Sequence, residues 1–176
     1  MASEEILDRN IRFSYSPQVK TNQIYLFAAV SLTLLDVMQA MLNMRWEWLY
    51  ALQNDVVYKQ VSGFLLFIYV FMQGRLGFQR LRYPSSSLRK LFYYHKVQGV
   101  FGPFLFYLHS VEVGFAYQVV LTSVFLLNCV FGYLSPQTIK IRNKIYTLCW
   151  TVLHISLAIM TFVLMCFHIF VVYYYS

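Results

Sequence analysis

The spacing of the four histidines is the feature of this sequence that most directly indicates chemistry. His95 and His109 have thirteen residues between them, and the same interval separates His154 from His168. An α-helix advances about 100° and 1.5 Å per residue, so fourteen steps rise about 21 Å and end about 40° short of four full turns. The two histidines of each interval are therefore expected on one face of a helix, with one imidazole near each end.

Both intervals lie in segments that are apolar enough to cross a membrane. The chain has 59% hydrophobic and 12% charged residues and a mean hydropathy of +0.54, whereas about a quarter of the residues of a soluble domain are charged. Apolar runs of about twenty residues match a hydrocarbon core about 30 Å thick. They are continuous, unlike the alternating segments of about ten residues in a transmembrane barrel. We therefore expect an all-α membrane protein.

The apolar runs predict one transmembrane domain, residues 1–176, built as a bundle of five helices. The predicted spans are approximately residues 24–44, 60–78, 91–110, 115–134 and 146–174. Residues 45–59 mix aromatic and charged side chains, which is typical of the membrane interface. Gly102-Pro103 is expected to kink the third span, and Ser135-Pro136 to end the fourth.

The basic residues predict the orientation of this bundle. Three lie in the N-terminal segment, five between the second and third spans, and three between the fourth and fifth, whereas only Arg45 and Lys59 lie on the opposite side. Basic residues favour the inner side of a membrane, which places the N-terminus inside and the C-terminus outside. This placement also accounts for the net charge of +7, so we expect no nucleic-acid partner.

Because one span separates the third from the fifth, these two run in the same direction. This alignment matches His95 with His154, here called the inner pair, and His109 with His168, called the outer pair. Two facing imidazoles are an axial ligand set for haem iron, so we expect two bis-histidine b-type haems. Any single histidine has other uses, as a proton relay or an interhelical hydrogen bond. A non-haem ion fits worse, since the histidines on each helix are far apart.

Glycines and cations near His95 suit the same interpretation. Gly99 and Gly102 follow His95 at helical spacing and leave its face without side chains, where a flat macrocycle fits; ordinary helix packing is the alternative. Basic residues at the inner end could pair with haem propionates or simply satisfy the charge rule: Arg82, Arg89, Lys90 and Lys96. Glycines of the second span are interpreted as positions of close helix approach: Gly63, Gly74 and Gly77.

The remaining polar and sulfur-bearing residues give weaker signals. Asp36, Gln39 and Asn43 share one stripe of the first span and must face protein or water. Asp36 is either a proton-handling group or a packing contact. The cysteines are expected to be membrane-core thiols, without a disulfide or zinc site: Cys129, Cys149 and Cys166.

The pattern over residues 91–170 resembles the ferric reductase-like transmembrane domain. Its elements are His-x3-Gly-x9-His, a span ending in Ser135-Pro136, Trp150-x2-Leu153-His154, and a second His-x13-His. That superfamily includes NADPH oxidases, metalloreductases and the haem-bearing membrane subunit of bacterial methionine sulfoxide reductase systems. The resemblance implies electron passage between an inner and an outer haem. The family commonly has six spans rather than five.

The larger reductases and oxidases of that superfamily carry a flavin- and nicotinamide-binding domain after the haem domain. This sequence shows no Gly-rich phosphate fingerprint, so we expect no NAD(P)H oxidation by this chain alone. We assign it no catalytic residue of its own.

The leading functional hypothesis is a dihaem b-type cytochrome subunit of a hetero-complex in a bacterial inner membrane, in preference to an organellar one. It would take electrons from a flavoprotein, a quinol or another subunit and pass them to a metal, oxygen or an extracytoplasmic redox protein. One alternative is an accessory structural subunit of a larger respiratory or photosynthetic complex. Another is a histidine-dependent proton or ion transporter, for which Asp36 would be the residue to test.

Overall fold

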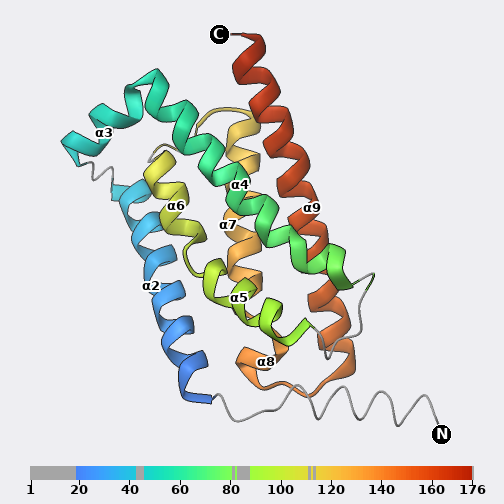
Figure 1. Ribbon diagram of the computed structural model, residues 1–176. Helices are drawn as coiled ribbons and strands as arrows, with labels where there is room; N and C mark the ends of the chain where they lie inside the picture. Colours follow the sequence, from blue (N-terminus) through green and yellow to red (C-terminus); the bar gives the residue numbers. More distant parts are fainter. Residues whose placement is uncertain are drawn as a thin grey trace, which may run out of the picture.

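Every regular element in the part of the chain that the structure describes is a helix (Figure 1). The computed structural model describes residues 19–42, 46–80, 82, 88–110, 112 and 114–175. The helices are α2 (Val19–Leu42), α3 (Glu47–Asn54), α4 (Val56–Arg80), α5 (Arg89–Gly99), α6 (Gly102–His109), α7 (Tyr117–Tyr133), α8 (Pro136–Ile139) and α9 (Lys144–Tyr174). The predicted all-α class is confirmed for these residues.

Two of these helices are long and apolar enough to cross a membrane, α4 with 25 residues and α9 with 31. α7 is apolar but has 17 residues. α2 begins at Val19, before the predicted start of the first span at residue 24. The predicted third span forms two helices, α5 and α6, instead of one. The count of five spans therefore stays a prediction.

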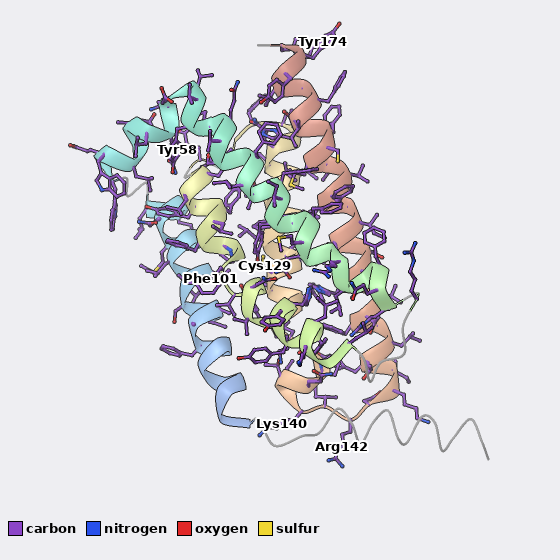
Figure 2. The ribbon with its side chains drawn as sticks, in the orientation of Figure 1. Tyr58, Phe101, Cys129, Lys140, Arg142 and Tyr174 are labelled. Carbon is purple, nitrogen blue, oxygen red and sulfur yellow. The ribbon has the colours of Figure 1, made fainter. Side chains whose placement is uncertain are left out.

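The interruption between α5 and α6 has a cause in the sequence. Pro103 has no backbone N–H to donate to the carbonyl of Gly99, and its ring crowds that carbonyl. The chain tightens there: Phe101 N donates to Gln98 O at 2.9 Å, and α6 restarts with Pro103 in its first turn. The predicted break at Gly102-Pro103 is confirmed, and Phe101 lies near mid-height of the bundle (Figure 2).

Proline also determines the connection from α7 to α9. α7 ends at Tyr133, and Ser135 caps the short α8, which has Pro136 at its first position. Such a position tolerates proline because its N–H would have no partner inside the helix. Asn143 then caps α9 by accepting from the backbone N–H groups of Ile145 and Tyr146. The predicted end of a helix at Ser135-Pro136 is confirmed, whereas its crossing of a membrane stays a prediction.

α7 packs along α9, and α4 lies across α5, α6 and α9, while α2 packs on α6 and α7 (Figure 1). α3 and the C-terminal end of α6 lie at one end of the bundle with Tyr174, and Lys140 and Arg142 lie at the opposite end (Figure 2). We call these the α3 end and the α8 end. The histidines on α5, α6 and α9 are thereby placed at two heights inside one bundle.

The outer surfaces of α4 and α9 are apolar. Large side chains are more than half exposed there, for example Val57 at 66% and Phe170 at 62%, and Trp46 and Trp48 of the predicted interfacial segment are exposed at 56% and 58%. Apolar patches of this extent are rare on soluble monomers and mark contact with lipid or with another protein.

Candidate functional site

The inner pair lies where α5 faces α9. The ring centroids of His95 and His154 are 6.2 Å apart and the ring planes are inclined by 75°. A metal lies about 2.0–2.1 Å from a bound imidazole nitrogen, as zinc does, and about 1.1 Å further separates the nitrogen from the ring centroid, so two rings on opposite sides of one metal are about 6.3 Å apart. The observed separation is close to this value, and it is also the separation of an ordinary edge-to-face ring contact.

His95 is oriented by the main chain of α4. Its Nδ1 lies 3.2 Å from the carbonyl oxygen of Gln73. A carbonyl can only accept, so Nδ1 carries the proton and Nε2 keeps its lone pair. The hydroxyl of Tyr69 donates to the carbonyl of Gln98 at 2.9 Å and fixes α5 against α4. His95 therefore presents the nitrogen that can bind a metal.

His154 is held by α7 and by its own helix. Trp150, one turn earlier, stacks on it with ring centroids 5.3 Å apart and planes inclined by 17°. The indole N–H of Trp150 donates to the carbonyl of Phe131 at 2.6 Å. A Cβ at Gly132 would lie 3.5 Å from the ring, which is ordinary contact. Nδ1 of His154 is buried without a partner of hydrogen-bond geometry, and the backbone of Asn128 interacts with this ring.

In the outer pair, His109 packs on α4. Its Nδ1 lies 3.0 Å from Oγ of Ser62, and a Cβ at Gly63 would lie only 3.1 Å from its Cε1. Gly63, interpreted from the sequence as a packing position, thus makes room for the imidazole itself. A larger residue at that position would need the ring to shift by a few tenths of an ångström.

Side chains of α3 and α4 also secure the end of α6 that carries His109. Gln53 Nε2 donates to the carbonyl oxygens of Tyr107 and Leu108 at 2.7 and 3.3 Å, and the hydroxyl of Tyr58 donates to the latter at 2.8 Å. The last carbonyls of a helix have no partner inside it. These bonds satisfy them, and they fix where α6 ends.

His168 belongs to α9 and contacts Tyr117, the first residue of α7. Its Nδ1 lies 3.2 Å from the phenol oxygen, and the ring of Tyr117 also packs edge-on against Phe167 at 5.2 Å. His168 interacts electrostatically with His109, although the two rings are not in direct contact. The structure therefore brings the rings of His95 and His154 into contact, whereas His109 and His168 are linked by an electrostatic interaction alone.

The two predicted glycines have different surroundings. A Cβ at Gly99 would meet nothing within 4 Å, so the face one turn after His95 is open. A Cβ at Gly102 would lie 3.0 Å from the hydroxyl of Tyr69 and 3.2 Å from Sγ of Cys129. A side chain at Gly102 would therefore meet neighbouring helices, whereas one at Gly99 would meet open space.

Two cations lie against the ring of Phe92 on α5. The guanidinium of Arg80 lies 5.7 Å from the ring centroid of Phe92, and Nζ of Lys96 lies 6.0 Å from the same centroid. Arg80 also interacts electrostatically with His95 and His154. Arg82 and Lys90 are exposed, and the side chains of Arg89 and Asp36 lie outside the described part. Arg80 was not among the predicted cations.

A bare metal ion finds no complete ligand set here. The described residues contain no group of three or more His, Cys, Asp or Glu side chains that could hold one, whereas a structural zinc ion takes four ligands. The three cysteines are free thiols in the structure. Each histidine pair supplies two nitrogens, which suits a metal that brings its remaining ligands with it.

Sequence reasoning missed the partners of the histidines. Ser62, Gln73, Tyr117 and Gly132 all touch an imidazole, and the only signal for any of them was the Ser62-Gly63 step in an otherwise apolar run. These contacts join helices that are distant in sequence, so no local pattern records them. Comparison with protein-family models, curated proteins and solved structures found no match for this chain.

Proposed function

We propose that this chain is a dihaem b-type cytochrome subunit of a membrane complex, similar in plan to the ferric reductase-like transmembrane domain. The observation that carries the proposal is the inner pair, whose ring centroids are 6.2 Å apart and in which Nδ1 of His95 faces the carbonyl oxygen of Gln73. Bound haem would supply one-electron redox chemistry, and the protein would supply its binding and orientation.

His95 and His154 would ligate one haem and His109 and His168 the other, each through Nε2. For His95, His109 and His168, the contact of Nδ1 with a fixed oxygen would select the tautomer and hold the ring plane, as is usual for metal-bound histidine. The open face at Gly99 gives the macrocycle room. Arg80 and Lys96 beside Phe92 suit carboxylates, which are the peripheral groups of haem.

The apolar exteriors of α4 and α9 support a membrane location, which we propose to be a bacterial inner membrane. The basic α8 end would face inward and receive electrons from a flavoprotein, a quinol or another subunit. The α3 end would deliver them to a separate acceptor. The chain therefore acts as an electron conduit within a hetero-complex.

The test is the reduced-minus-oxidised visible spectrum of the full chain purified in mild detergent, with haem measured per chain. We expect a b-type spectrum and two haems per chain. His95→Leu and His109→Leu should each lower the haem content to one per chain. Absence of a b-type signal, or a signal unchanged in both variants, would overturn the proposal and leave an accessory structural role.

A further inference from the structure

The inner and outer pairs differ in the oxygen that faces each Nδ1. In the inner pair, the carbonyl oxygen of Gln73 on the main chain faces Nδ1 of His95. Nδ1 of His154 has no partner of hydrogen-bond geometry among the described residues, and the backbone of Asn128 lies near this ring. In the outer pair the oxygen that faces Nδ1 is a side-chain hydroxyl, that of Ser62 for His109 and that of Tyr117 for His168. A main-chain carbonyl remains whatever residue stands at that position, whereas a hydroxyl is lost when Ser or Tyr is replaced by a residue without one.

The direction of the bond between His109 and Ser62 follows from the hydrogen of the hydroxyl. Oγ of Ser62 donates to the carbonyl of Tyr58, one turn earlier, at 2.7 Å. A hydroxyl has one hydrogen and two lone pairs, so its oxygen is left to accept from Nδ1–H of His109 at 3.0 Å. Serine therefore holds His109 in the tautomer that frees Nε2.

Tyr117 stands in the same relation to His168. If Nε2 binds iron, Nδ1 must keep its proton. The phenol oxygen of Tyr117, 3.2 Å away, then accepts a hydrogen bond from Nδ1–H. The edge-on contact with Phe167 holds the phenol ring in position. Both outer imidazoles would then donate to hydroxyl oxygens contributed by α4 and α7.

We infer that Ser62 and Tyr117 are positioning residues that set the ligand strength of the outer pair, and hence the reduction potential of the outer haem. The inference rests on the proposed function. A hydrogen bond from Nδ1–H makes an imidazole a more basic ligand; a more basic ligand stabilises ferric iron and lowers the potential. Lys59, which interacts electrostatically with His109, acts in the opposite sense and stays unchanged in the variants below.

The experiment is a potentiometric titration of the haem spectrum of the full chain in mild detergent. Ser62→Ala and Tyr117→Phe each remove one acceptor, and one of the two haem couples should move to higher potential. Loss of such a partner commonly changes metal binding at least tenfold, and a tenfold change in the ratio of reduced to oxidised haem is about 59 mV for one electron. The second couple should not move.

Ser62→Thr keeps the hydroxyl and should restore the original potential. Ser123→Ala on an exposed position of α7 and Tyr173→Phe at the α3 end are matched controls that should leave both couples in place. Two bound haems with unchanged couples in Ser62→Ala and Tyr117→Phe would overturn the inference and leave the proposed function standing. A chain that binds no haem would instead overturn the proposed function.

Discussion

The inner and outer histidine pairs are built by different means, although their spacing in the sequence is identical. The inner rings rest on the main chain of α4 and on the stacked Trp150. The outer rings rest on replaceable side chains from α4 and α7. Equal spacing therefore does not produce equal environments. The hydrogen-bond partners of the outer imidazoles can be removed by substitution of side chains.

The difference follows from where the histidines lie in their helices. His95 lies inside α5, whereas His109 is the last residue of α6. The carbonyls at a helix end need partners from elsewhere, and here Gln53 and Tyr58 provide them. The outer pair depends on α3 and α4 for this reason.

The largest expected effect concerns the pairing itself. When two residues bind one ligand together, the effects of replacing them do not add. The double variant His95→Leu, His154→Leu should therefore lose no more haem per chain than either single variant. His95→Leu combined with His168→Leu crosses the pairs and should lose both haems. Haem content per chain measures each case.

Equal loss in the paired and crossed double variants would contradict the assignment of inner and outer pairs. Folding of every variant is checked by helix content from circular dichroism, since the loss should appear in haem content and leave the helices intact.

The next effect concerns the end of α6. Gln53 is 5% exposed, and Gln53→Leu would remove the side-chain donor to the part-buried carbonyl of Tyr107, whereas the carbonyl of Leu108 keeps the hydroxyl of Tyr58. Leaving such groups unsatisfied costs about 1–3 kcal/mol. Thermal unfolding in mild detergent should show this loss, whereas Asn54→Leu, at an exposed position of the same helix, should have little effect. Equal stability of the two variants would show that Gln53 does not secure α6.

Two glycines that face histidines should respond differently to alanine. A Cβ at Gly63 would lie 3.1 Å from Cε1 of His109, whose ring is also held by its contact with Ser62, so Gly63→Ala should destabilise by about 1–3 kcal/mol through overpacking. Gly132→Ala places its Cβ at an ordinary 3.5 Å from His154 and should be tolerated. Thermal unfolding of the two variants in detergent tests this order, with Gly77→Ala, in open space, as the control.

The smallest effect concerns the support of His154. Trp150→Phe keeps an aromatic ring against the imidazole but removes the donor to the carbonyl of Phe131. Loss of one such hydrogen bond costs about 0.5–1.5 kcal/mol. The unfolding temperature should fall slightly, and only the inner haem should change in the redox titration. A change confined to the outer haem would reverse the assignment of Trp150.

The sequence alone determined the helical class and several helix boundaries, because these depend on local chemistry. Pro103 and Pro136 cannot donate a backbone hydrogen bond wherever they lie, and both mark breaks in the structure. Apolar composition identified α4 and α9 as long enough to cross a membrane. The equal histidine intervals also predicted which imidazoles lie near one another.

Only the tertiary structure decided what surrounds each imidazole. Gln73, Ser62 and Tyr117 reach the histidines across helix contacts between residues 22 to 51 positions apart in the sequence. The roles of the glycines also depend on contacts between helices. Gly63 makes room for His109, whereas the space beside Gly102 is occupied by the side chains of Tyr69 and Cys129. Periodicity defines the face of one helix, but the partner that meets this face depends on how the helices cross, and no single helix specifies that crossing.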